Sequence, residues 1–328
     1  MNYLGIDLSK KEFDVTLKTE RGEEHHAKFK NRKKGYVKLE KWLRKYGVVE
    51  LHVCMEATNV YWEEIAEYLY EKGYKVSVVN PLRIKGFAMS QMQRNKTDKL
   101  DSQVIVNFCI KMAPEGWTPP NATQKRLRAL VRHREALIKM RTQEKNRLTD
   151  CRDEFVKESL KGLIKTLSEE IDEIEAKIAE LIKEDEKLKE DKRLLTSIKG
   201  IGDVTAHTIM GEMYNLANYE SAHAAAADAG LSPAYHESGE TVRRKPRLSK
   251  MGKSLVRGGL YMPALNAMRT NPLVKAFADR LQRRKKHPMV IIAASMRKLL
   301  HLAYGVLKNR ADFDPDWLSN PTSKPATP

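Results

Sequence analysis

Cysteine is scarce in this chain of 328 residues, and long apolar runs are absent. The three cysteines, Cys54, Cys109 and Cys151, form no CxxC pair, which argues against a zinc site or a disulfide framework and for a reducing compartment. No stretch of 18 apolar residues is present, and no signal-peptide core follows Met1. We therefore expect a cytoplasmic protein without a membrane span.

Acidic residues are outnumbered by basic ones. The chain has 60 Lys and Arg against 43 Asp and Glu, which gives a formal net charge of +17. Such an excess favours a polyanionic partner, with nucleic acid first and a membrane surface second. Because no apolar segment supports membrane insertion, nucleic acid is the preferred interpretation. The length is sufficient for two domains with a helical spacer.

The first third of the chain alternates short apolar strands with amphipathic helices. This alternation predicts an α/β layer domain over residues 1–118. Strands are expected within 3–19 (two strands and a polar turn), 25–29, 51–55 and 75–79, and helices over 36–46, 60–72 and 97–112.

Residues 113–122 mark a boundary, because three prolines and a glycine cannot sit inside a regular element. A long basic helix is predicted next, over about 123–158, and residues 125–147 hold nine Lys or Arg and two acids. This helix could lie along phosphates, or its charges could form the solvated face of an ordinary packed helix. The candidate phosphate contacts are Lys125, Arg126, Arg128 and Arg132.

A heptad pattern follows the basic helix. Apolar residues from Ile164 to Leu181 are spaced 3, 4, 3, 4, 3, and residues 169–190 hold ten acids and four lysines. The acidic face should repel nucleic acid, so the seam should pack against another helix. That partner could belong to the same chain or to a second subunit. Residues 119–192 are thus predicted to be a long, coiled-coil-like helical linker.

A mainly α-helical domain is predicted over residues 193–314, followed by a proline-rich tail, 315–328, that we expect to be disordered. The sequence SIKGIGDV resembles a helix-hairpin-helix element. Glycines at 200 and 202 permit a tight hairpin with exposed backbone N–H groups, which can bind a phosphate beside Lys199. The alternative is a tight helix–helix turn without a ligand.

A basic loop is expected within the same domain. Residues 243–257 hold seven Lys or Arg and no acid, and a solvated surface loop is the alternative to a phosphate-binding one. Its candidate phosphate contacts are Arg243, Arg244, Lys245, Arg247, Lys250 and Lys253. Just upstream, Ser238 precedes a glycine, which is typical of a turn. If Ser238 were a nucleophile, His236 and Glu237 would be the local candidates to accept its proton.

Four carboxylates stand out by position. Asp7 interrupts the first apolar strand, and Glu56 ends the strand LHVCM. Asp98 and Asp101 open a helix at i and i+3, a spacing that places both on one face. Each acid alone could be a cap or turn residue. In this order, however, the set resembles the layout of RuvC/RNase H-like nuclease folds and could hold Mg²⁺ or Mn²⁺ for phosphodiester chemistry.

The whole set of motifs resembles the DEDD transposases of bridge-RNA-guided insertion sequences. The resemblance spans about residues 3–307 and rests on GIDLSK, MEATNVYWE, SVVNP, NKTDKLDS, KGIG, AGLSP, YHESG and LYMPAL. It implies that Asp7, Glu56, Asp98 and Asp101 form the metal-binding set of a RuvC-like domain. It also implies that Ser238 attacks a DNA phosphate and forms a covalent phosphoserine.

The resemblance implies partners as well. Donor and target DNA would pair with a structured non-coding guide RNA, and the protein would assemble as a homo-oligomer, a dimer or tetramer, through the helical linker. The carboxylates and the serine would come from neighbouring subunits. When bound to DNA, the cytoplasmic protein would associate with the nucleoid.

Three hypotheses follow. The first is a serine recombinase with metal assistance, the second is a metal-dependent RuvC-like nuclease without a covalent intermediate, and the third is a non-catalytic nucleic-acid-binding protein. A covalent protein–DNA adduct separates the first from the second, and loss of cleavage in EDTA separates the second from the third. Asp7 already disfavours the third, because an unused carboxylate in an apolar strand costs stability.

Overall fold

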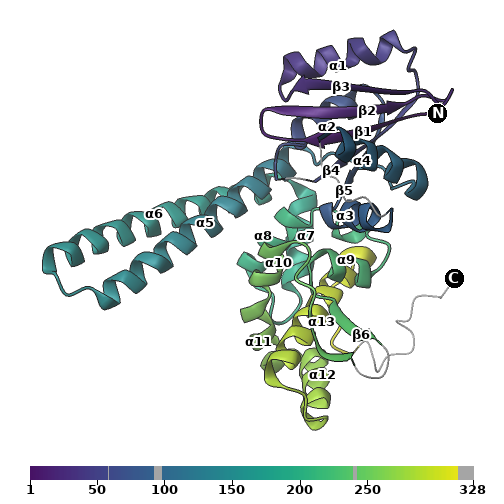
Figure 1. The fold of residues 1–328 in the computed structure, drawn as a ribbon. Coiled ribbons are helices and arrows are strands. Elements are labelled where there is room, and N and C mark those ends of the chain that lie inside the picture. Colours follow the sequence, from purple (N-terminus) through teal and green to yellow (C-terminus); the bar gives the residue numbers. More distant parts are fainter. Residues whose placement is uncertain (58, 92–97, 239–241, 317–328) are drawn as a thin grey trace. The chain divides into compact units, whose positions relative to one another are not determined.

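The computed structural model describes residues 1–57, 59–91, 98–238 and 242–316, with the side chains of 98–99, 235–238 and 242–246 left undescribed. The chain divides into two compact units, Met1–Pro119 and Pro120–Pro328 (Figure 1). Each unit has its own hydrophobic core.

A five-stranded sheet forms the centre of the N-terminal unit. Its spatial order is β3-β2-β1-β4-β5, with antiparallel pairing among the first three strands and parallel pairing from β1 through β4 to β5. The strand and helix predictions for this unit are confirmed, with shifts of a few residues at the ends. The strands are β1 (Asn2–Leu8), β2 (Glu12–Lys18), β3 (Glu24–Lys30), β4 (Leu51–Glu56) and β5 (Lys75–Val79).

Helices cover both faces of this sheet. On one face α1 (Lys33–Lys45) and α2 (Glu63–Glu71) pack against the larger apolar cluster, to which Ile6 and Met55 contribute. On the other face α3 (Pro81–Ser90) and α4 (Asp98–Met112) pack against Cys54 and Val79. Helix α3 was not predicted from the sequence.

Gly5 lets α4 lie directly on β1. A Cβ atom at this position would stand 2.3 Å from the backbone oxygen of Ser102 and 2.4 Å from the backbone nitrogen of Val106. The hydroxyl groups of Thr16 and Ser102, 2.8 Å apart, join β2 to the same helix. The first turn of α4 is therefore fixed against the sheet by backbone contact.

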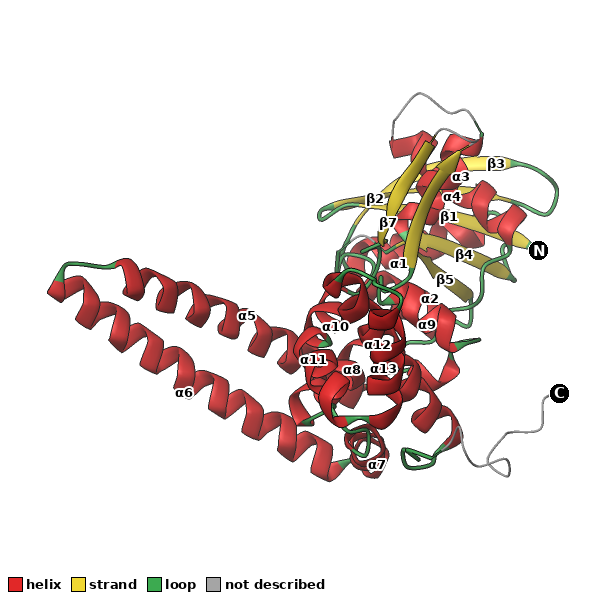
Figure 2. Ribbon diagram, turned by 90° about the horizontal axis from the view of Figure 1, so that it is seen from below, coloured by secondary structure: helices red, strands yellow, loops and turns green. Residues whose placement is uncertain are grey.

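The second unit begins with a helical hairpin (Figures 1 and 2). The predicted helix over 123–158 is wrong in extent, because α5 (Ala122–Asp150) ends and α6 (Glu154–Glu184) starts within that range. The side chain of Asp153 accepts a hydrogen bond from the Val156 backbone and caps α6. Four seam residues are buried in the core shared with α5: Ile171, Ile174, Ile178 and Leu181. The heptad seam thus finds a partner within the chain.

A helical body completes this unit. It contains α7 (Glu186–Thr196), α8 (Asp203–Glu212), the 3₁₀ turn η1 (Leu216–Asn218), α9 (Ala222–Asp228), α10 (Ser254–Gly259), α11 (Tyr261–Thr270), α12 (Pro272–Arg283) and α13 (Pro288–Asn309). Helix α13 is long and apolar enough to span a membrane by length and composition. It packs, however, against α7, α9, α11 and α12, as expected of a core helix.

One part of this body departs from the prediction. A β-hairpin, β6 (Pro233–Ser238) and β7 (Val242–Leu248), replaces the expected turn and the first part of the expected basic loop. Residues 254–257 of that loop belong to α10. Four of the seven residues of β7 are basic and one is proline, a composition that is typical of a loop and not of a strand.

Candidate active site

Asp7 and Glu56 lie beside each other at the carboxyl edge of the sheet. Strands β1 and β4 are parallel, and their register pairs Ile6 with Met55, so the next residues along the two strands are Asp7 and Glu56. Neighbouring strands are about 4.8 Å apart. Both residues are half-buried. The two strand-borne acids of the prediction are thus brought together.

The direction of α4 places its first turn at the same edge. Ser102 contacts β2 at Thr16, whereas further along the helix Asn107 accepts a hydrogen bond (2.8 Å) from Lys18. Helix α4 therefore runs antiparallel to β1, and its amino-terminal end points toward the edge that carries Asp7. Asp101 precedes Ser102 by one residue and is half-buried. Asp98 begins the helix, and its side chain lies outside those that the structure describes.

Among the described side chains, no group of three or more His, Cys, Asp or Glu lies close enough together to hold a metal ion. That search leaves out the side chain of Asp98. The donor chemistry still suits a hard divalent cation, because each of the four predicted residues supplies carboxylate oxygens.

Sequence reasoning missed Asp14, another acid on the same face of the sheet. It is the direct cross-strand partner of Asp7, and such partners share a face. Its side chain is almost fully buried and lies 3.0 Å from Lys28 Nζ and 3.2 Å from His26 Nε2. In the alternating pattern EFDVTLK, Phe13 and Val15 face the core and Asp14 faces the other side of the sheet, so no sequence signal marked Asp14 as buried. The ion pair with Lys28 explains how a second acid is tolerated beside Asp7.

Two cysteines lie in the apolar cluster between the sheet and α4. Cys54, two residues before Glu56, and Cys109 on α4 are both fully buried. A hydrogen bond with Cys109 and burial raise the pKa of the Cys54 thiol. A neutral, enclosed thiol fills space in the core, so Cys54 supplies no ligand to this edge of the sheet.

The predicted hairpin in the second unit is a turn between α7 and α8. Gly200 adopts a positive φ of 107°, and a Cβ there would stand 2.6 Å from the Ala267 Cβ, so glycine is required. The backbone oxygen of Lys199 accepts a hydrogen bond from Asn271 (3.1 Å). Gly202 and the start of α8 are exposed. Asp203, however, already places a carboxylate in the first turn of α8, where a phosphate would bind.

The basic helix α5 uses part of its charge internally. Arg132 donates two hydrogen bonds to Glu212, at 2.5 and 3.1 Å, and thereby joins α5 to α8. Arg134 is fully buried and donates to Thr208 (3.3 Å). Arg126 is exposed. Some of the positive charge in this helix is therefore structural.

Ser238 is the last residue of β6. The backbone register of the hairpin pairs Ser238 with Val242, Glu237 with Arg243 and His236 with Arg244. Each acid or imidazole candidate is thus opposite an arginine in the neighbouring strand. The side chains of these residues and the whole of residues 239–241 lie outside the described part of the chain. Arg247, Lys250 and Lys253 follow on β7 and the loop after it.

Comparison with known proteins covers both units. Residues 4–156 match a DEDD transposase family model of the IS110 type, and residues 192–279 match the family described as "Transposase IS116/IS110/IS902 family". The chain is 32% identical to a pilin gene-inverting protein of Moraxella lacunata over 319 residues, which covers 95% of this chain and 97% of the relative. The chain belongs to this transposase family.

Other relatives agree with that membership. The transposase is 31% identical to a pilin gene-inverting protein of Moraxella bovis, over 95% of this chain and 97% of the relative. It is 25% identical to the transposase for insertion sequence element IS1328 of Yersinia enterocolitica, over 72% of this chain and 75% of the relative. The protein is therefore a DNA transposase or recombinase of an insertion sequence.

The family membership confirms the coarser predictions: an enzyme, DNA as a partner and transposition as the process. DEDD transposases usually depend on a metal ion. A DNA-acting enzyme is also consistent with the predicted cytoplasmic location.

Proposed function

We propose that this transposase cuts and rejoins donor and target DNA through a covalent bond to Ser238, assisted by its carboxylates and guided by a structured non-coding RNA. The observation that carries the proposal is the common edge at which Asp7, Glu56 and the first turn of α4 meet. The second family match, which includes position 238, supports a shared chemistry around this serine.

The carboxylates form the metal-binding part of the proposal. Asp7, Glu56, Asp98 and Asp101 would hold Mg²⁺ or Mn²⁺. When bound, such an ion would polarise the scissile phosphate and stabilise the departing oxygen. Asp7 and Glu56 are fixed by the sheet, whereas Asp98 and Asp101 are fixed by the packing of α4 over Gly5. The protein thus orients its ligands through backbone packing.

The serine step conserves the phosphodiester bond energy. The Ser238 Oγ forms a bond to the DNA phosphorus, the phosphorus–oxygen bond to one sugar breaks, and the released sugar oxygen takes up a proton. His236 or Glu237 would accept the serine proton. Attack by the sugar hydroxyl of another strand reverses the step and frees the serine. No external energy source is needed.

RNA guidance rests on the resemblance of the sequence motifs, with charge as further support. Pairing between guide RNA and DNA would supply sequence specificity, and basic side chains would hold the backbones. The exposed Arg126 on α5, Lys199 in the α7–α8 turn, Arg247 on β7 and Lys250 after it are available as phosphate contacts. Lys253 already lies 3.7 Å from Asp228. Arg132 is less suited, since it already binds Glu212.

A trapping experiment tests this proposal. Full-length protein, its cognate non-coding RNA, labelled donor and target DNA, and Mg²⁺ are mixed, denatured and separated on a gel. We expect a labelled protein–DNA adduct in the wild type that is lost at least about 100-fold in Ser238→Ala, because the nucleophile is removed. Ser249→Ala, a serine just after β7, is the matched control and should form the adduct.

Two outcomes would contradict it. An adduct of normal yield in Ser238→Ala would remove the serine from its role. Cleaved DNA without any adduct, sensitive to EDTA and unaffected by Ser238→Ala, would identify a metal-dependent nuclease of the RuvC type.

A further inference from the structure

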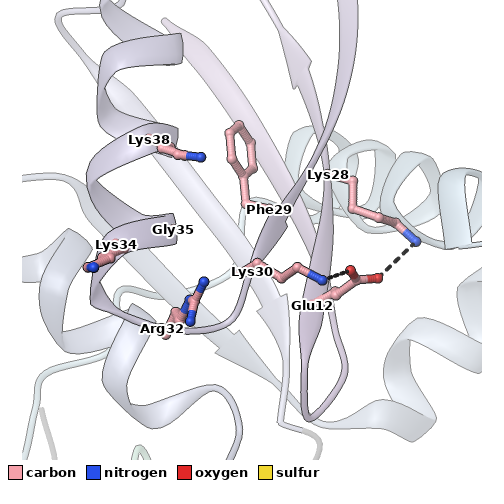
Figure 3. Close-up of a pocket in the computed structure, with 8 residues that line it drawn as sticks. All are labelled: Glu12, Lys28, Phe29, Lys30, Arg32, Lys34, Gly35 and Lys38. Carbon is pink, nitrogen blue, oxygen red and sulfur yellow. Dashed lines mark hydrogen bonds and ion pairs between the residues drawn. The ribbon is translucent and has the colours of Figure 1, made fainter.

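A basic cleft of about 150 Å³ lies where β3 meets α1. Five cationic side chains line it: Lys28, Lys30, Arg32, Lys34 and Lys38 (Figure 3). Glu12 is its acidic side chain. In sequence, residues 28–38 hold six Lys or Arg and no acid.

Close backbone packing brings these cations together. The Arg32 backbone N–H donates to the Lys30 carbonyl (2.8 Å), which turns the chain sharply from β3 into α1. A Cβ on Gly35 would stand 1.8 Å from that same carbonyl oxygen, so only glycine allows the helix to begin so close to the strand. Lys34 and Lys38, one turn apart on α1, are thereby held close to β3, whereas Lys28 points away from α1, toward Glu12 (Figure 3).

Only part of this charge is balanced within the protein. Lys30 Nζ lies 2.6 Å from Glu12, and Lys28 lies 3.0 Å from Asp14 and 3.8 Å from Glu12. Arg32, Lys34 and Lys38 are exposed and form no ion pair with a carboxylate in the described part of the chain. Like charges held this close favour an external anion.

The start of α1 adds to this imbalance. Its first turn contains no acid, and no side chain caps it. Cations at a helix amino terminus oppose the helix dipole, so Lys33 and Lys34 raise the local positive potential further. The cleft therefore combines exposed cations and backbone N–H groups, which are the two kinds of group that bind phosphate.

We propose that this cleft binds a backbone phosphate of the DNA strand that the carboxylate edge processes. The proposal deepens the proposed function and rests on it for the identity of the strand. Lys28 is on β3, opposite Asp14 of β2, which is itself opposite Asp7 of β1. Two strand spacings, about 10 Å, separate β3 from β1. That corresponds to about three base steps along a duplex.

Lys28 links the two places directly, because it contacts both Asp14 and Glu12. A bound phosphate would compete with these carboxylates for the cation. DNA is favoured over RNA as the occupant, since the cleft is within a few nucleotides of the residues proposed to act on DNA.

Salt-dependent binding tests the cleft separately from catalysis. The full-length triple variant R32A/K34A/K38A is compared with wild type and with K161A/K165A/K177A, which removes three exposed cations from α6. Labelled duplex DNA, single-stranded DNA and RNA are titrated without divalent metal over a range of KCl concentrations. We expect the salt slope for DNA to fall by about two to three in the cleft variant, since each phosphate contact contributes about 0.9 for duplex DNA. The α6 control should keep the wild-type slope.

A second variant guards against misfolding. R32K/K34R/K38R keeps the charge and should restore the wild-type slope, and circular dichroism should give equal melting curves for all variants. An unchanged DNA slope in R32A/K34A/K38A, or a change confined to RNA, would overturn the proposal. Neither result would affect adduct formation at Ser238, so the failure of the cleft and the failure of the proposed function are distinguishable.

Discussion

His207 on α8 is a buried imidazole whose Nε2 has no hydrogen-bond partner among the described residues. Burial lowers its pKa to about 4, with further contributions from Lys192 and Arg134, whereas Asp203 acts in the opposite direction. The neutral form is therefore the folded form. In the unfolded chain the same group takes up a proton near pH 6.5. Folding is thus linked to the loss of a proton.

This linkage predicts acid sensitivity. The pKa of His207 is lower in the folded than in the unfolded chain. The stability that its neutral form contributes is therefore present above pH 6.5 and is lost as the pH falls toward 4. Between pH 7 and pH 5 we expect His207 to reduce the free energy of unfolding by about 1–2 kcal/mol. Urea unfolding of wild type and His207→Gln at both pH values measures this change in the free energy of unfolding. His133→Gln, on the surface of α5, is the control. An equal loss in His207→Gln and wild type would show that another group is responsible.

Individual residues of the site differ in how well they could be predicted from the sequence. Asp7 and Glu56 could be predicted because a charge at an apolar strand position needs a reason. Asp14 could not be ranked in the same way, since its neutralising partners, His26 and Lys28, lie on another strand. The basic run over residues 28–38 is visible in the sequence, but its arrangement around a cleft is not, because this depends on the sharp turn before Gly35.

Helix α4 carries Asp98 and Asp101, and Gly5 determines where this helix lies on the sheet. The prediction concerns Gly5→Ala, whose added Cβ would meet two backbone atoms of α4. Backbone cannot rotate away, so the helix must shift and carry Asp98 and Asp101 with it. We expect a destabilisation of about 1–3 kcal/mol and a loss of strand cleavage on the order of 100-fold.

Thermal melting measures the destabilisation, and a strand-cleavage assay measures the loss of activity. Gly162→Ala on α6, where an added Cβ meets no neighbour within 4 Å, is the control and should be neutral or stabilising by up to about 1 kcal/mol. Wild-type cleavage in Gly5→Ala would mean that the position of α4 does not matter for the reaction.

Elements were predicted best where periodicity was strong. The five strands and the strongly amphipathic helices α1 and α2 follow from apolar spacing. Helices α3 and α4 are both weakly amphipathic, and α3 was overlooked. The break between α5 and α6 was also missed, because residues 151–153 contain neither proline nor glycine and the Asp153 cap is a single side chain. The β6–β7 hairpin was missed because each strand contains a proline and four of the seven residues of β7 are basic.

At the scale of the whole molecule, the chain carries its two proposed catalytic parts on separate compact units. The carboxylates belong to Met1–Pro119 and Ser238 belongs to Pro120–Pro328. The heptad seam is occupied by α5, so it gives no argument for subunit pairing. An oligomer with sites shared between subunits therefore remains a proposal that needs its own test.

Mixing two inactive variants provides that test. Asp101→Asn alone should abolish adduct formation with its fold intact, as should Ser238→Ala. If one subunit supplies the carboxylates and another the serine, mixed assemblies contain some sites with both wild-type parts. We expect adduct formation to return to roughly a quarter of the wild-type yield, by random pairing of subunits in a dimer. Yields that stay at background would show that both parts act within one chain.

The acidic edge of the sheet is completed in two stages as the chain is synthesised. Asp7 and Glu56 pair as soon as β1 and β4 have formed, but α4 closes the face only after residues up to about 112 have been synthesised. A chain released early, before that helix, would have two carboxylates without the other two. In the proposed reaction such a product would be unable to cut DNA, because it would lack both the second pair of carboxylates and Ser238, which is synthesised later still.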